Sequence, residues 1–224
     1  ADIVPGLTEC LVLWGTSPAQ SDNSAFWQHI RAYAAGGGAL VVVDPRRTEA
    51  AAIADVWLPV RPGTDAVLAL GLLNVIIGEE LYDASFVDAW CSGFDELARA
   101  VAPLAPEAVA VTCGVSADDI RRAARLFSGG RASALVSGRG IDQIGAAVAP
   151  THRALCCLRA ITGNVDKPGA CVLAEAPDFV SELAMEMSDA MPASCRAAAL
   201  SSYRTPLQSY AGYDAPVSYT HLTL

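Results

Sequence analysis

The sequence predicts a doubly wound α/β domain with a mostly parallel sheet flanked by helices, followed by a less regular C-terminal part. Residues 10–14 and 40–43 are short, continuously apolar runs, typical of strands that are buried on both faces. Between them, residues 25–35 carry apolar side chains at helical spacing, and residues 36–38 are three glycines that end the helix. A strand, a helix and a strand within about 34 residues form a parallel βαβ unit, as in Rossmann-like dinucleotide-binding domains.

The same alternation continues along the chain. A short helix is expected at residues 48–54 and a short strand at residues 56–58. A long apolar helix follows, capped by Thr64 or Asp65, running through Ile77 and ended by Gly78. The remaining expected elements are helices at residues 83–90 and 94–101, a helix starting at Ser116, a strand at residues 132–136, a loop at residues 137–143, and helices at residues 146–161 and 177–191. We therefore expect an α/β domain over residues 1–173 and an irregular or helical tail over residues 174–224.

Composition argues against several classes of function. The 224 residues include 24 acidic and 15 basic side chains, and the net charge of −9 argues against nucleic-acid binding. No run of about 18 residues is uniformly apolar, so direct membrane insertion is not expected. The seven cysteines form no C-x-x-C pair and have no spacing suited to zinc or an iron–sulfur cluster. Their odd number favours buried, reduced thiols over a disulfide framework.

The loop after the first strand has the sequence Gly15-Thr16-Ser17-Pro18. Its backbone N–H groups can meet a phosphate group at the start of the following helix. The loop lacks the G-x-G-x-x-G pattern of nicotinamide sites, and Pro18 removes one donor. An ordinary nicotinamide-binding site is therefore disfavoured.

The loop after the second strand contains Asp44, Arg46 and Arg47. An acid at this position often holds ribose hydroxyl groups, and a guanidinium group matches a phosphate group. The alternative is structural, with Asp44 making a turn and the arginines pairing with Glu49 or Asp55. Spacing alone leaves both interpretations open.

A third loop joins Gly63 and Thr64 to Asp65 at the start of the long helix. A carboxylate in the first turn of a helix is favoured by the helix dipole even without a ligand. The same carboxylate is suited to accept hydrogen bonds from N1–H and the 2-amino group of guanine, which adenine does not offer. The motif alone is compatible with either role.

No residue is identified as a nucleophile, a general acid or a general base. His29, His152 and His221 cannot be matched to a cysteine or serine by their sequence positions. Paired carboxylates for acid–base chemistry are not identifiable either. The sequence therefore predicts a cofactor-binding protein with no catalytic and no metal-ligating residue of its own.

Taken together and in chain order, these motifs resemble the molybdopterin oxidoreductases of the dimethyl-sulfoxide-reductase type. The resemblance covers residues 9–173, and the similar segments lie at residues 13–23, 42–49, 54–65, 72–77, 93–95 and 158–164. Members of this family hold two molybdopterin guanine dinucleotides (MGD) around molybdenum or tungsten. The resemblance thus implies the same cofactor for the parent of this chain.

The resemblance also implies that this part of the chain holds the guanosine end of one of the two dinucleotides. Three loops surround the nucleotide in the family, and a fourth approaches the pterin. Matched position by position, the implied cofactor-binding residues are Trp14, Gly15, Thr16, Pro18, Asp44, Arg46, Gly63, Thr64, Asp65 and Gln143.

Other parts of the family's pattern do not occur in the 224 residues. They contain no cysteine motif for an iron–sulfur cluster, no loop that supplies a metal ligand, and no C-terminal β-rich domain. Residues 217–224 match nothing in the family and are interpreted as read-through from a truncated gene. We therefore expect an internal fragment without turnover. Its parent is expected to carry an iron–sulfur cluster, to catalyse two-electron redox chemistry such as oxygen-atom transfer, and to exchange electrons with an electron-transfer subunit.

Two other functions are kept as alternatives. A relative that lost its metal would serve as a non-catalytic scaffold in an electron-transfer complex, but such relatives tend to lose the nucleotide loops that are intact here. A generic Rossmann-like module would bind NAD or FAD without preferring guanine.

Overall fold

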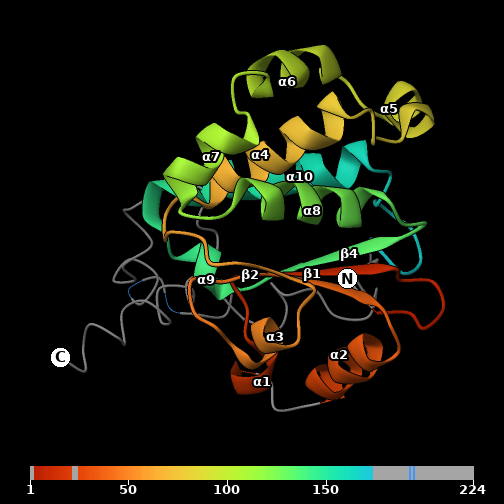
Figure 1. Ribbon diagram of the computed structural model, residues 1–224, viewed down its shortest axis with the longest axis vertical. Coiled ribbons are helices and arrows are strands. Elements are labelled where there is room, and N and C mark those ends of the chain that lie inside the picture. The colour runs from red at the N-terminus through yellow and green to blue at the C-terminus, as the bar shows by residue number, and fades with distance from the viewer. Residues whose placement is uncertain (1–2, 22–24, 174–191, 193, 195–224) are drawn as a thin grey trace. The chain divides into compact units, whose positions relative to one another are not determined.

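A computed structural model of the chain describes residues 3–21, 25–173, 192 and 194. The chain divides into two compact units, Ala1–Leu173 and Ala174–Leu224. The helix expected at residues 177–191 lies outside the described residues. In the first unit, a sheet lies between two layers of helices (Figure 1).

The sheet has four parallel strands, and their order confirms the predicted doubly wound α/β class. The strands are β1 (Cys10–Trp14), β2 (Ala39–Val43), β3 (Val56–Leu58) and β4 (Ser133–Ser137). They are arranged in the order β3-β2-β1-β4. The chain leaves β1 toward β2 on one side and reaches β4 on the other side of β1. This reversal of direction defines the topological switch point of such sheets.

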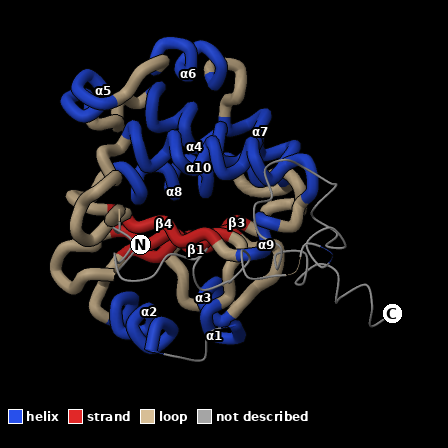
Figure 2. The backbone as a smooth tube through the Cα atoms, turned by 180° about the vertical axis from the view of Figure 1, so that it is seen from behind, coloured by secondary structure: helices blue, strands red, loops and turns tan. Residues whose placement is uncertain are grey.

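The helices cover both faces of the sheet (Figures 1 and 2). One face carries the short helices α1 (Pro18–Ser21) and α3 (Glu49–Ala52) and the longer α2 (Ala25–Ala35). The other face carries α4, α7, α8 and α10, with α5 and α6 further out. Their bounds are α4 (Asp65–Gly78), α5 (Ala84–Trp90), α6 (Phe94–Val101), α7 (Pro106–Cys113), α8 (Ala117–Ser128) and α10 (Val148–Ile161).

Strand β1 contributes buried side chains to the core on both faces of the sheet. All five of its residues are buried, and successive side chains point to opposite faces of the sheet. Cys10, Val12 and Trp14 belong to the core cluster under α4, α8 and α10, whereas Leu11 and Leu13 belong to the cluster that contains residues of β2 and α2. A strand with two buried faces has no polar alternation, so its sequence is continuously apolar.

Helix α4 is the central helix of the larger layer. Its buried side chains include Leu68, Leu72, Leu73 and Ile76, and it packs against α7, α8 and α10. The helix is apolar around its circumference because it has neighbours on several sides. Among the described residues, no helix is both long and apolar enough to cross a membrane.

Three local features differ from the predictions. Helix α7 was not predicted from the sequence; it begins with Pro106 and is ended by Gly114, whose φ is 74°. Its few buried positions, Val109 and Cys113 among them, leave only a weak helical pattern. The predicted loop at residues 137–143 contains a helical turn, α9 (Arg139–Asp142). The helix expected at residues 146–161 starts as a 3₁₀ turn, η1 (Gly145–Ala147), before α10.

Candidate functional site

Four loops meet where the strands end, at what we call the carboxyl edge of the sheet. In the β-sheet register, Trp14 lies beside both Val43 and Ser137, and Val43 lies beside Leu58. The four strands therefore end level with one another. The loops at residues 15–17, 44–48, 59–64 and 138–147 leave from this common line. Open α/β sheets bind their ligands in this place.

The loops after β1 and β4 are in direct contact. Gly15 N donates to the Val43 carbonyl (2.8 Å), Gly138 N donates to the Trp14 carbonyl (2.9 Å), and Gly140 N donates to the Gly15 carbonyl (3.2 Å). Gly15 has a φ of 59°, and a Cβ atom there would lie 2.9 Å from Cγ2 of Ile141. Glycine is therefore required for this approach of two backbones.

The loop after β1 offers unused hydrogen-bond donors. Within the part of the chain that the structure describes, the backbone N–H groups of Thr16 and Ser17 have no acceptor. Pro18 has no N–H, and its side chain is buried at the start of α1. Ser17 Oγ is buried without a hydrogen-bond partner. Buried polar groups normally have partners, so this loop is compatible with a polar ligand.

The loop after β2 is held by its own hydrogen bonds. Asp44 Oδ1 accepts a hydrogen bond from Arg46 N (2.8 Å), which makes a local turn. The Asp44 carbonyl accepts from Nε1 of Trp57 on β3 (2.9 Å). The guanidinium group of Arg47 lies over the Trp57 ring, 5.9 Å from its centroid. Trp57 thus contacts this loop through a hydrogen bond and through its ring.

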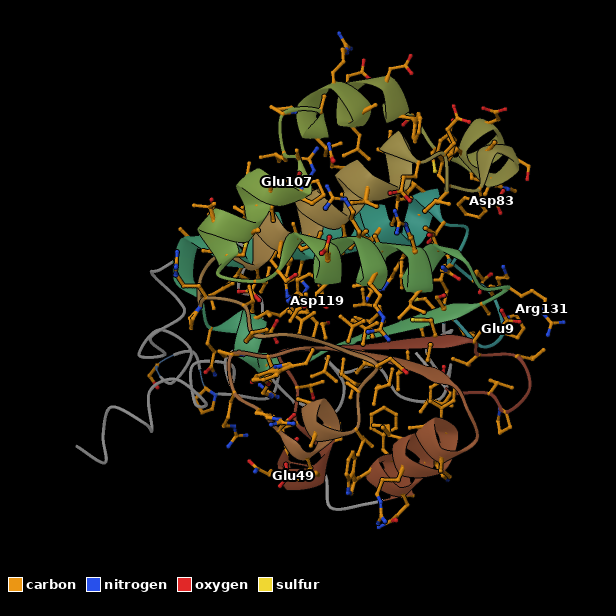
Figure 3. The ribbon with its side chains drawn as sticks, viewed as in Figure 1. Glu9, Glu49, Asp83, Glu107, Asp119 and Arg131 are labelled. Atoms are coloured by element: carbon orange, nitrogen blue, oxygen red, sulfur yellow. The ribbon has the colours of Figure 1, made fainter. Side chains whose placement is uncertain are left out.

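The exposed guanidinium group of Arg46 is oriented by Gln20 of α1. Arg46 Nη2 donates to Oε1 of Gln20 (2.7 Å), and the amide of Gln20 donates to the Glu49 carboxylate (3.2 Å). Glu49 lies at the start of α3 (Figure 3). Its pKa is lowered by a hydrogen bond from its own backbone N–H, then by Gln20 and by the charge of Arg46. Among the described residues, neither Arg46 nor Arg47 forms an ion pair with Glu49 or Asp55.

The loop after β3 leads into α4. Gly63 has a φ of 86° and open space around it, and Thr64 Oγ1 donates to the Arg61 carbonyl (2.7 Å). Thr64 is the N-cap of α4, but its side chain makes no capping hydrogen bond. Arg61 is fixed at the C-terminal end of α7, because its backbone N–H donates to the Cys113 carbonyl (2.8 Å). The unpredicted helix α7 therefore positions this loop.

Asp65 lies in the first turn of α4 and is 5% exposed. Its Oδ1 accepts a hydrogen bond from Nε1 of Trp14 (2.8 Å). Its Oδ2 forms no hydrogen bond with the described residues. This oxygen is not fully buried, so it retains contact with solvent. The Trp14 side chain is completely buried. Trp14 therefore holds one oxygen of Asp65 by a hydrogen bond, and its own side chain is not exposed at the edge.

Gln143 lies at the end of α9 and is exposed. The neighbouring Asp142 contacts Nε2 of His152 on α10 (2.7 Å), which connects this loop to the helix that follows it. The loop starts beside Gly15, next to the loop after β1. The four predicted loops thus follow neighbouring strands and lie at the same edge of the sheet.

A large hollow lies at the opposite end of the strands. Its volume is about 610 Å³, and Thr8, Glu9, Tyr33 and Gly38 line it near the amino ends of β1 and β2. Glu9 is paired there with Arg131 at 2.8 Å (Figure 3). The volume of this hollow does not assign it a function, whereas the carboxyl edge gathers polar groups from several loops, which is typical of a binding site. No group of three His, Cys, Asp or Glu side chains in the described part of the chain is arranged to hold a metal ion.

Fold and edge together define a doubly wound α/β domain of the kind that takes ligands outside the carboxyl ends of its strands. The chain belongs to the molybdopterin oxidoreductase family, whose sequence model matches residues 8–199. This confirms the resemblance that was based on the motifs.

Known relatives are much longer than this chain. Acetylene hydratase of Syntrophotalea acetylenica is 35% identical over 208 residues, which are 93% of this chain and 28% of the relative. Formate dehydrogenase H of Escherichia coli is 36% identical over 163 residues, 73% of this chain and 22% of the relative. The solved structure of acetylene hydratase from Pelobacter acetylenicus matches with a TM-score of 0.65 at 39% identity, over 70% of this chain and 22% of that one. The chain therefore spans about a quarter of the length of these relatives.

Three supporting residues were not predicted from the sequence. Gln20 orients Arg46, Trp57 supports Asp44, and Arg61 connects the third loop to α7. Trp57 carried a signal that was available, because an indole N–H within a short strand needs a hydrogen-bond partner. The partner of Gln20 lies 26 residues away along the chain, and no local pattern identifies it.

Proposed function

We propose that this chain holds the guanosine end of one of two molybdopterin guanine dinucleotides in a molybdenum or tungsten enzyme. The observation that carries the proposal is the convergence of three kinds of group at the carboxyl edge. These are the unpaired N–H groups of Thr16 and Ser17, the guanidinium group of Arg46, and the Asp65 carboxylate with one oxygen unused. Membership of the family supports the same role.

Each group has a counterpart on a guanine nucleotide. The amides of Thr16 and Ser17 and the Arg46 guanidinium group suit the oxygens of a diphosphate. The Asp44 carboxylate suits the ribose hydroxyl groups. The free oxygen of Asp65 suits the N1–H and 2-amino donors of guanine. The residues present therefore fit the nucleotide part of the cofactor.

The remaining predicted residues shape the site or reach further along the cofactor. Gly15 and Pro18 set the path of the first loop, and Gly63 and Thr64 set the path of the third. Gln143, exposed on the loop after β4, is the residue proposed to approach the pterin. None of these side chains acts on a substrate.

The metal-bearing cofactor supplies two-electron chemistry, of oxygen-atom-transfer type, when it is bound in the whole enzyme. The residues of this chain only bind the cofactor, orient it and exclude water from its nucleotide end. An iron–sulfur cluster and an electron-transfer subunit belong to other parts of the whole protein. The relatives are named as a hydratase and a dehydrogenase, so similarity alone does not select the reaction.

Calorimetry with the 224-residue chain tests the nucleotide site. GDP is expected to bind more tightly than NAD, because only GDP offers two donors to Asp65. Arg46→Ala should weaken GDP binding about tenfold, the usual effect of losing a charge-assisted hydrogen bond. Arg125→Ala is the matched control, because Arg125 is bonded to Glu79 away from the edge and should leave binding unchanged. Tighter binding of NAD than of GDP would contradict the proposal and favour a generic dinucleotide module.

Assays of the purified chain test its role as a cofactor-holding part. We expect no reduction of a sulfoxide or of nitrate with a reduced dye as electron donor. The reason is that the chain contributes binding groups and no identified reacting group. Turnover above a buffer blank would show that the chain is a complete catalyst.

A further inference from the structure

Two tryptophan side chains donate hydrogen bonds to Asp65 and Asp44 at the carboxyl edge. Nε1 of Trp14, at the end of β1, donates to Oδ1 of Asp65 at 2.8 Å. Nε1 of Trp57, in the middle of β3, donates to the backbone carbonyl of Asp44 at 2.9 Å. The first bond acts on a side chain and the second on a backbone group. The two tryptophans therefore control different parts of the edge.

The Trp14 bond determines how the Asp65 carboxylate is oriented. Trp14 has no exposed surface and is packed in the core between the sheet and the larger helix layer, so its indole ring cannot turn away. An indole N–H is a donor only, and when buried it needs an acceptor. Oδ1 of Asp65 is thereby held toward the core. Oδ2 is left as the oxygen that keeps contact with solvent.

We propose that Trp14 is a positioning residue that sets the base specificity of the edge. This inference rests on the proposed guanine-nucleotide function. With Oδ1 held by Trp14, Asp65 presents its free oxygen in one orientation before any ligand arrives, and a base with donors at that position is favoured. Hypoxanthine lacks the 2-amino donor of guanine. Adenine presents an acceptor at N1 and leaves the carboxylate without a partner.

Trp57 supplies a natural comparison within the same site. Its hydrogen bond fixes the backbone of Asp44, at the loop that is suited to ribose and phosphate groups. GDP, IDP and ADP share those groups. Loss of the Trp57 N–H should therefore weaken all three nucleotides by a similar factor, whereas loss of the Trp14 N–H should act on the base.

The test is calorimetry of GDP, IDP and ADP with the 224-residue chain and with Trp14→Phe and Trp57→Phe. In Trp14→Phe, the ratio of GDP to IDP affinity should fall about tenfold, the scale of one charge-assisted hydrogen bond. In Trp57→Phe that ratio should stay at the wild-type value. A wild-type ratio in Trp14→Phe would overturn the inference alone. A wild-type chain that binds the three nucleotides equally would overturn the proposed function itself.

A second measurement needs no substitution at Trp14. The indole N–H signals of the ¹⁵N-labelled wild-type chain are recorded by NMR, and the signals of the other three tryptophans are assigned with Trp27→Phe, Trp57→Phe and Trp90→Phe variants. The Trp14 signal should move when GDP is added, and it should move less with IDP, because Oδ2 of the carboxylate that accepts its hydrogen bond binds the 2-amino group. A Trp14 signal that stays in place at saturating GDP would overturn the inference, even if Trp14→Phe does not fold.

Discussion

Glycines determine how closely the loops after β1 and β4 approach each other. A Cβ atom on Gly138 would lie 2.4 Å from Cβ of Thr16 and 2.5 Å from the carbonyl oxygen of Gly15. A Cβ atom on Gly140 would lie 2.8 Å from the same oxygen. The obstructing atoms belong to backbone or lie next to it, so no flexible side chain can move aside.

Gly138→Ala should therefore destabilise the protein. We expect the free energy of unfolding to fall by about 1–3 kcal/mol, as in other overpacked sites. Gly78→Ala is the control, because Gly78 ends α4 with open space around it, and alanine there should raise stability by up to about 1 kcal/mol. Urea unfolding measures both variants. Equal stabilities of Gly138→Ala and the wild type would contradict the close packing of the two loops.

At the scale of elements, β1 and α2 enclose ionisable groups near the amino ends of the strands. Cys10 is 1% exposed, and burial, followed by the charge of Asp55, raises the pKa of its thiol to about 12. Burial also raises the pKa of Tyr33 above its ordinary value, with Cys10 as a smaller cause. The Tyr33 hydroxyl donates to the Ala39 carbonyl at the start of β2. Both groups are therefore held in their protonated forms by the fold.

This arrangement predicts a loss of stability in alkaline solution. Between pH 9 and about 12, the unfolded chain releases the Cys10 proton, starting from an ordinary pKa of 9.0, while the folded chain keeps it. The unfolded state then binds fewer protons, so stability falls as pH rises, by up to about 1.4 kcal/mol per pH unit for each such group. Urea unfolding at pH 8 and pH 10.5 measures the slope, and Cys10→Ala should make it shallower. An unchanged slope in Cys10→Ala would show that Cys10 does not contribute.

At the scale of the whole described unit, burial is distributed unevenly between the layers. Helix α4 buries eight of its residues, whereas α5 buries only Val87 and α6 buries only Val101. Helices α5 and α6 lie furthest from the sheet (Figures 1 and 2). Few buried apolar contacts imply a low free energy of local opening.

Hydrogen exchange followed by mass spectrometry should therefore separate two regions. Peptides from β1 and α4 should exchange slowest, because β1 contributes residues to both core clusters and α4 contributes many residues to the larger one. Peptides from residues 84–101 should exchange faster by at least about tenfold. Equal protection in α5, α6 and α4 would show that the outer helices open only when the whole unit unfolds.

The sequence by itself determined the fold class and the position of the edge. β1 and α2 have the predicted bounds, and β2 differs by one residue, because a strand buried on two faces and a helix buried on one have characteristic local patterns. Parallel strands bring their following loops to one edge, so the four loops could be predicted to converge. Helix α7 could not, because its few buried side chains face α4 and α8, which lie elsewhere in the sequence.

Only the tertiary structure decided what individual side chains at the edge do. Trp14 was predicted as a cofactor-binding residue; in the structure its side chain is completely buried and donates to Asp65, 51 positions along the chain. Arg46 had two interpretations, and its observed partner is Gln20 of a different element. Local sequence patterns record which residues are buried, since burial repeats with the period of the helix or strand. A hydrogen bond between distant segments depends on how the elements pack, and that becomes visible only in three dimensions.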